Sequence, residues 1–97
     1  MTNLTAGRMF EKRFRYFLIL LREFEVMDIK DIEKYLGIKG MTLTVFLRAS
    51  RVKLDEIKVY RAKYKNDRGV DKVKHIYYMG DMTPQKLMLI GKKYTTE

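Results

Sequence analysis

Apolar side chains recur every three or four residues through the first quarter of the chain, and this spacing predicts a long helix over residues 8–26. Leu18, Ile19 and Leu20 widen its apolar stripe well beyond one face. A helix that is apolar over so much of its circumference must pack against other elements on two sides. We expect the following helices to cover one side and a C-terminal helix or a second subunit to cover the other. The main apolar positions are Phe10, Phe14, Phe17, Leu21 and Phe24.

A short second helix is predicted over residues 28–36. Asp28 can accept hydrogen bonds from the free N–H groups at its start, and Asp31 in the first turn suits the helix dipole. Gly37 can adopt the left-handed conformation that ends a helix. The apolar residues three and four positions apart that form one face are Ile29, Ile32 and Leu36.

A third helix is predicted over residues 41–51, with Thr42 as its cap or in its first turn. Its buried face would consist of Leu43, Phe46 and Leu47. This helix and the helix over 28–36 would meet at a tight turn around Gly37. The positions facing outward are then Lys39, Gly40, Met41, Thr44, Val45 and Arg48.

Strand-like alternation replaces the helical spacing after Arg51 and predicts a β-hairpin over residues 57–79. Residues 65–69 form its turn by composition. Thr83 and Pro84 then start a C-terminal helix over residues 84–94, as cap and first helical residue. In the first strand, alternation places Tyr60, Ala62 and Tyr64 on one face and Arg61, Lys63 and Lys65 on the other.

The two central helices resemble the helix-turn-helix family in seven positions, although Glu33 stands where the family has a small residue and Lys39 where it has a serine. The tyrosine-rich return strand and the Thr83-Pro84 helix are similar to the end of winged-helix regulators. The resemblance implies one winged helix-turn-helix domain over residues 1–97, an α+β fold that is mostly α. The matching positions are Ile32, Leu36, Gly37, Ile38, Thr42, Leu43 and Leu47.

Positive charge is concentrated in the second part of the chain. The net charge is +9. Residues 35–97 contain fourteen Lys and Arg against six Asp and Glu, so they account for +8 of it. A polyanion is the natural partner of such a surface. The alternative is that the charge only keeps the protein soluble.

The resemblance implies that residues 39–51 enter the major groove of double-stranded DNA and that the hairpin, the wing, lies on the backbone. Arg48 is the first candidate for a base contact, because Arg pairs bidentately with guanine. Arg68, beside Gly69 at the hairpin tip, is the candidate for a minor groove. The complete set of expected DNA contacts is Lys39, Met41, Thr42, Thr44, Val45, Arg48, Arg51, Lys53, Arg61, Lys63, Lys65, Arg68, Lys72 and Lys74.

Several of these residues have another interpretation. Met41, Thr44 and Val45 give an unusually apolar reading face, so they could instead pack in the core or dock onto a protein. The hairpin lysines could be a solvated edge that suppresses aggregation. We expect a homodimer, although the C-terminal stripe could equally pack inside one chain. The predicted dimer interface is Phe17, Leu20, Leu87, Ile90 and Tyr94.

We therefore expect a sequence-specific transcriptional regulator. Two alternatives use the same fold: a small viral or plasmid factor that binds a host protein, and a replication or partition accessory that binds DNA with little sequence preference. Salt dependence separates the last from a specific regulator, because non-specific binding is dominated by counterion release.

Other classes of protein are disfavoured. The single histidine, His75, lies in a predicted strand, and the acidic residues between positions 23 and 33 match no calcium-loop spacing, so we expect no enzyme, no metal and no cofactor. The sequence contains no cysteine, which excludes disulfides. The longest apolar run, Phe17–Leu21, is far too short for a membrane span, and the first residues show no signal-peptide pattern. We expect a cytoplasmic protein with no membrane partner.

Overall fold

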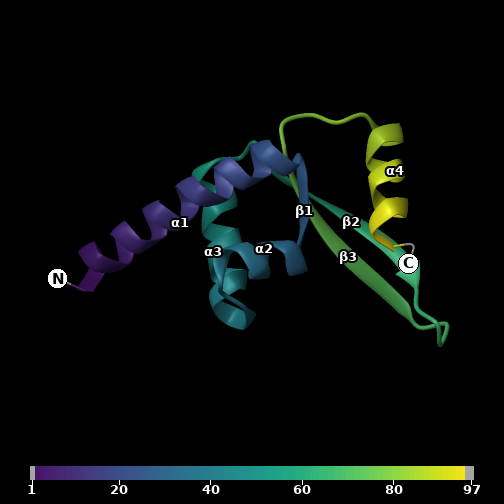
Figure 1. Cartoon of the computed structure of the whole chain (residues 1–97), viewed down its shortest axis with the longest axis horizontal. Coiled ribbons are helices and arrows are strands. Elements are labelled where there is room, and N and C mark those ends of the chain that lie inside the picture. Colours follow the sequence, from purple (N-terminus) through teal and green to yellow (C-terminus); the bar gives the residue numbers. More distant parts are fainter. Residues whose placement is uncertain (1, 96–97) are drawn as a thin grey trace.

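The computed structural model describes the backbone of residues 2–95 and the side chains of residues 8–95. The fold is α+β and mostly helical, as the sequence predicts, with a three-stranded antiparallel sheet (Figure 1). In chain order its elements are α1 (Thr2–Phe24), β1 (Val26–Asp28), α2 (Ile29–Leu36), α3 (Gly40–Lys53), β2 (Ile57–Lys65), β3 (Asp71–Met79) and α4 (Pro84–Thr95).

Helix α1 begins and ends earlier than the apolar pattern predicts. It runs over Thr2–Phe24 instead of 8–26. Glu25 takes a left-handed conformation with φ 66°, which breaks the helix. The next three residues, Val26–Asp28, then form a strand that the sequence analysis did not predict. The chain thus passes directly from α1 into the sheet.

The predicted cap of α2 is present and is reciprocal. The Asp28 carboxylate accepts a hydrogen bond from the Asp31 N–H at 2.9 Å, and the Asp31 carboxylate accepts one from the Asp28 N–H at 3.3 Å. This satisfies two N–H groups that the helix cannot pair itself. Gly37 ends the helix in the left-handed conformation, with φ 68°.

Of the two predicted roles of Thr42, cap or member of the first turn of α3, the structure shows the second. Lys39 occupies the N-cap position and makes no side-chain capping bond, whereas Thr42 lies inside the first turn. Gly40, at φ 64°, is already the first helical residue, so the helix starts earlier than predicted. Thr44 donates its hydroxyl proton to the Gly40 carbonyl at 3.2 Å.

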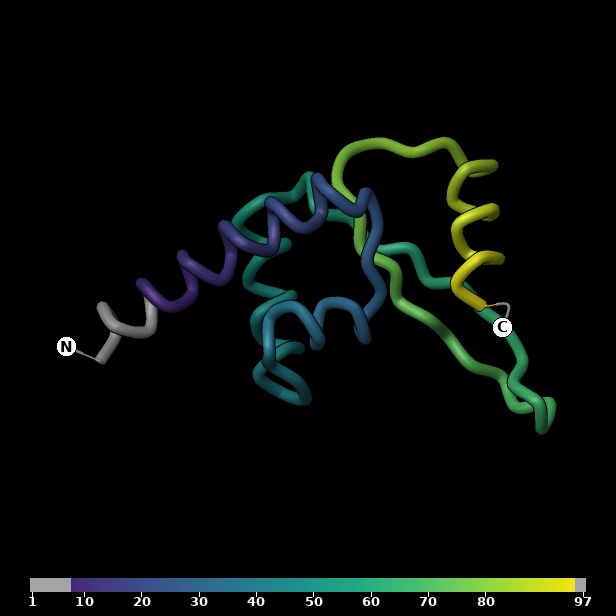
Figure 2. The backbone as a smooth tube through the Cα atoms, in the orientation of Figure 1, coloured from purple at the N-terminus to yellow at the C-terminus, as the bar shows by residue number. Residues whose placement is uncertain are grey.

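The sheet has the strand order β1-β3-β2. Ile57 pairs with Met79 and Lys65 with Asp71, which confirms the hairpin predicted over residues 57–79. This register places Arg61 opposite His75 and Ala62 opposite Lys74. Because directly opposed residues share a face, Arg61 and His75 lie on one face and Ala62 and Lys74 on the other. The hairpin extends well beyond the three N-terminal helices (Figure 2).

The main core lies between α1, α2, α3 and one face of the sheet. Phe17, Ile32 and Leu21 are almost completely buried there, and Met27 of β1 and Tyr77 of β3 close it from the sheet. The rings of Phe17 and Phe46 meet edge to face at 5.6 Å, which joins α1 to α3. The shared core thus packs α3 together with α1 and the sheet.

Helix α4 covers the opposite face of the sheet (Figure 1). Thr83 caps it as predicted, accepting from the Lys86 N–H at 3.2 Å. Gly91 permits close approach, because a Cβ there would lie 3.0 Å from the Tyr60 ring and 3.4 Å from the Cβ of Ala62. The sequence analysis expected this helix or a second subunit to cover the second side of α1. Helix α4 packs on the sheet, so the expectation for this helix is wrong.

The predicted dimer interface therefore needs correction. Phe17 and Leu20 are 0% and 6% exposed, so neither offers a surface to a second subunit. Three further residues of the predicted set are half-buried on the side of α4 that carries Gly91, which faces the sheet: Leu87, Ile90 and Tyr94.

Candidate nucleic-acid interface

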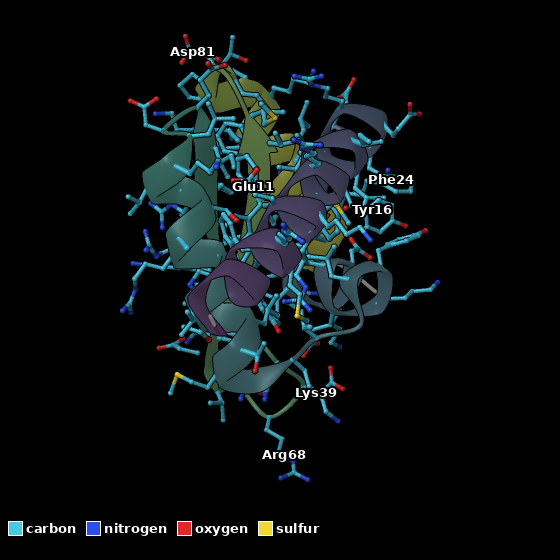
Figure 3. The ribbon with its side chains drawn as sticks, turned by 90° about the vertical axis from the view of Figure 1, so that its left-hand side faces the viewer. Glu11, Tyr16, Phe24, Lys39, Arg68 and Asp81 are labelled. Atoms are coloured by element: carbon cyan, nitrogen blue, oxygen red, sulfur yellow. The ribbon has the colours of Figure 1, made fainter. Side chains whose placement is uncertain are left out.

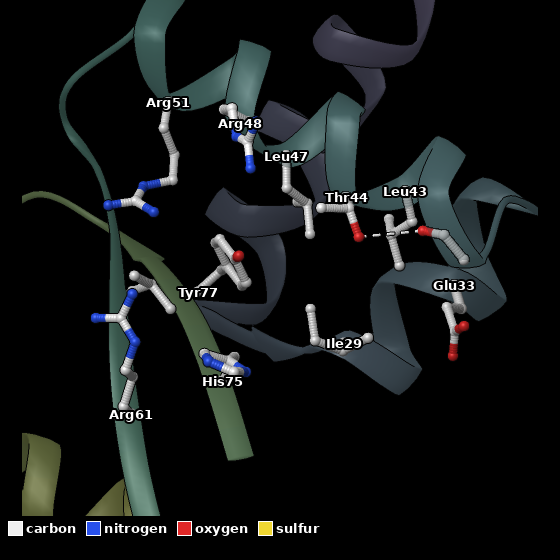
Figure 4. Close-up of a pocket in the computed structure, with 12 residues that line it drawn as sticks. Ile29, Glu33, Leu43, Thr44, Leu47, Arg48, Arg51, Arg61, His75 and Tyr77 are labelled. Carbon is white, nitrogen blue, oxygen red and sulfur yellow. Dashed lines mark hydrogen bonds between the residues drawn. The ribbon is translucent and has the colours of Figure 1, made fainter. Parts of the chain in front are cut away.

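A cleft of about 470 Å³ separates α2 and α3 from the β2–β3 hairpin (Figure 4). Its floor is apolar and is formed by core residues, while its rim carries most of the charge. Ile29 and Glu33 come from α2, and Val59 comes from β2. The other lining residues are Gly40, Leu43, Thr44, Leu47, Arg48, Arg51, Arg61, His75 and Tyr77.

Three arginines from two elements meet at the rim of this cleft. Arg48 and Arg51 are exposed on α3, one helical turn apart, and Arg61 is exposed on β2. Within the described part of the chain, none of the three forms an ion pair. Glu33 stands at the other end of the cleft from Arg51 and Arg61 (Figure 4). The cleft is therefore a cationic surface whose guanidinium groups are available to a ligand.

Tyr77 lies inside the cleft and is a residue that the sequence analysis missed. It is 7% exposed, and its ring lies between Arg51 and His75 in Figure 4. Burial raises the pKa of the Tyr77 hydroxyl, while the charges of Arg51 and Arg61 act in the opposite direction. The hydroxyl is therefore protonated at neutral pH. Strand alternation predicts that Tyr77 and His75 share one face of β3. Only the observed pairing of β2 with β3 shows that Arg61 lies on the same face of the sheet.

The outward face of α3 is more apolar than is usual for a surface helix. Met41 is 76% exposed and Val45 57%, and Thr44 is exposed as well. The alternative that these three residues pack in the core is therefore wrong. Met41 and Val45 border a second, apolar groove of about 380 Å³ between α1 and α3. Its lining is Phe10, Arg13, Met41, Thr42, Val45, Phe46 and Ala49.

The hairpin carries its predicted cations on two different faces. Lys63 and Lys65 share the face of Arg61, whereas Lys72 lies on the opposite face. The tip is ordered by Asn66, whose side-chain oxygen accepts from the N–H groups of Arg68 and Val70 at 2.9 Å each. Arg68 projects from this tip at the same end of the molecule as Lys39 (Figure 3).

Two lysines predicted to contact DNA are engaged within the protein. Lys53 pairs with Glu11 and lies over the ring of Phe14, 5.4 Å from its centre. Lys74 lies 3.6 Å from the Asp28 carboxylate and donates to the Tyr94 carbonyl at 3.0 Å. Both interactions join distant parts of the chain, and sequence spacing gave no sign of them. We therefore remove both lysines from the candidate interface.

Comparisons with known proteins add no family to this picture. No protein-family model matches the chain, and no curated protein matches it. Among the described residues, no helix has the length and apolar content to cross a membrane. The same residues contain no group of three or more histidines, cysteines and carboxylates arranged for a metal ion. The candidate interface thus rests on its own geometry and charge.

Proposed function

We propose that this protein binds double-stranded DNA as a winged helix-turn-helix protein. One observation carries the proposal: Arg48 and Arg51 of α3 and Arg61 of the hairpin border one cleft, and none of the three forms an ion pair in the described chain. The order of helices and strands and the β1-β3-β2 sheet are compatible with a winged helix. An uncompensated cationic surface of this kind favours a polyanion.

In the proposed complex, residues 39–51 enter the major groove and the hairpin follows the phosphate backbone. Arg48 lies on the exposed face of α3 and donates to a guanine edge. Met41 and Val45 touch thymine methyl groups, which gives the exposed apolar stripe a role in reading sequence. Sequence-specific regulation of transcription is the activity that this combination supports best.

Selection of bound duplexes from a random DNA pool tests the proposal. We expect one enriched sequence motif, and a palindromic motif if the regulator acts as a homodimer. Arg48→Ala should weaken binding to the selected duplex by about tenfold or more. Lys93→Ala, which removes an exposed cation on α4, is the matched control and should bind like the wild type. The absence of duplex binding at low salt would overturn the proposal.

Docking onto another protein is a second candidate, and the apolar groove between α1 and α3 favours it. Met41 is three-quarters exposed, and Val52 on the same helix is 82% exposed. Such exposed apolar groups are typical of contact surfaces. Met41→Ala separates the two candidates. If Met41 contacts DNA, the variant should lose its preference for duplexes with thymine at the contacted position. If Met41 contacts a protein, the DNA sequence preference should not change.

A further inference from the structure

The cleft between α3 and the hairpin combines features that a general cationic surface does not need. Its arginines come from elements that meet only in the folded protein, since Arg51 lies at the end of α3 and Arg61 lies in β2. Like charges brought to one concave site repel each other, and the low-dielectric wall strengthens that repulsion. In the described chain neither guanidinium forms an ion pair, and Glu33 lies at the other end of the cleft (Figure 4). An anion from outside the chain would relieve this repulsion.

Tyr77 adds a neutral donor to the same place. Its ring is mostly buried, whereas its hydroxyl forms no hydrogen bond with the described residues and is not among their buried unpartnered polar atoms, so it is open to the cleft. A hydroxyl that is open to the cleft and has no partner in the described chain is free to bond to water or to a ligand. The hydroxyl is protonated, because burial keeps its pKa above the usual range. It can therefore donate to an anion held between the arginines.

We propose that Arg51, Arg61 and Tyr77 form a site for one phosphate group, namely a backbone phosphate of a DNA strand that runs between α3 and β2. The guanidinium fork fits two oxygens of a phosphate, and the phenol hydroxyl supplies a directed third bond. The DNA source rests on the proposed function, whereas the phosphate chemistry rests on the cleft alone. A free phosphate is the other source, and the experiment separates the two.

This site fixes the register of the bound DNA. A phosphate seated at Arg51 and Arg61 lies between the helix in the major groove and the hairpin on the backbone. The strand cannot slide along α3 without leaving the Tyr77 hydroxyl. One phosphate should therefore contribute more to affinity than its neighbours, in contrast to the even contribution of solvated lysines.

A scan with methylphosphonates tests the site. Each phosphate of the selected duplex is replaced in turn by a neutral methylphosphonate, and affinity is measured for the wild type and for Tyr77→Phe. We expect one position per bound protein where the neutral group weakens wild-type binding by about tenfold and weakens the variant much less. Tyr64→Phe, which removes a phenol hydroxyl on the opposite face of β2, is the matched control and should give the wild-type profile.

A second arm uses inorganic phosphate and follows the Nε–Hε signals of Arg51 and Arg61 by NMR. A shift that saturates in the wild type and is lost in Arg61→Ala supports the phosphate site even if no duplex is bound, and then assigns a free phosphate as its ligand. A DNA profile that is identical in wild type and Tyr77→Phe, with no saturable phosphate shift, overturns the site while leaving DNA binding intact. No response in either arm overturns both proposals.

Discussion

The two faces of the β2–β3 hairpin hold cations in different environments. On the face toward α3, Arg61 and the opposed His75 border an open cleft, and Arg61 has no carboxylate partner in the described chain. On the face toward α4, Lys74 is bound by the Asp28 carboxylate and the Tyr94 carbonyl. Neighbouring positions of one strand pair thus supply a proposed binding group and a structural group. The side of the sheet, more than the charge itself, determines which role a residue takes.

The largest effect is expected from removing the carboxylate on the α4 face. Asp28→Ala should lower the free energy of unfolding by about 2 kcal/mol, because it removes the α2 cap and the partner of the half-buried Lys74. Urea denaturation measures this loss. Asp71→Ala is the control, since its contact with Lys65 is long and exposed and should contribute about 0.5 kcal/mol or less. An equal loss in both variants would contradict the structural role of Asp28.

A matched pair on the hairpin tests the comparison directly. Arg61→Ala should weaken DNA binding by about five- to tenfold and change stability by about 0.5 kcal/mol or less. Lys74→Ala should do the reverse, with unchanged binding and a stability loss of about 1 kcal/mol. Fluorescence anisotropy and urea denaturation give the two quantities. If the two variants behave alike, the faces are not functionally distinct.

Salt dependence gives a smaller and more specific difference. Each phosphate contact that is lost lowers the slope of log affinity against log salt by about 0.9. Arg51→Ala should show this change, because its guanidinium borders the cleft. Lys93→Ala on α4 should retain the wild-type slope. A reduced slope in this variant would mean that the DNA contacts the α4 side of the sheet, contrary to the proposal.

The last effect is confined to strongly alkaline pH and concerns stability. Burial, together with the charges of Asp31 and Asp28, raises the pKa of Tyr94 to about 12 from an ordinary value of 10.0. The unfolded chain therefore loses this proton first, so the stabilisation is complete below pH 10 and is lost as pH rises through about 12. Tyr94→Phe should lose less stability than the wild type across this interval. If the wild type and Tyr94→Phe lose equal stability between pH 10 and 12, the Tyr94 hydroxyl does not contribute to this pH dependence.

Local signals in the sequence predicted much of the fold. Asp28 and Gly37 mark the ends of α2 through capping chemistry that needs only neighbouring residues. Alternation predicted the hairpin and the faces of β2. Strand β1 was missed, because three residues are too few to show a period. The end of α1 was missed because nothing in the apolar pattern marks Glu25 as a left-handed residue.

The candidate site was less predictable, because its members are joined only by tertiary packing. Arg48 and Arg51 could be assigned to the exposed side of a helix from their spacing alone. Tyr77 could not be associated with them until the register of β3 was known. The ion pair of Lys53 could not be predicted, because a positive charge in the sequence does not show whether a carboxylate such as Glu11 lies beside it.

Strand β1 has a consequence for the order in which the chain can fold during synthesis. Val26 pairs with Tyr78 and Asp28 with Ile76, so β1 has no partner until the ribosome has made nearly the whole hairpin. Until then, the aromatic stripe of α1, including Phe17, lacks the sheet that completes its cover. A nascent chain stalled before β3 should therefore expose this stripe to chaperones, and release of about ten more residues should hide it.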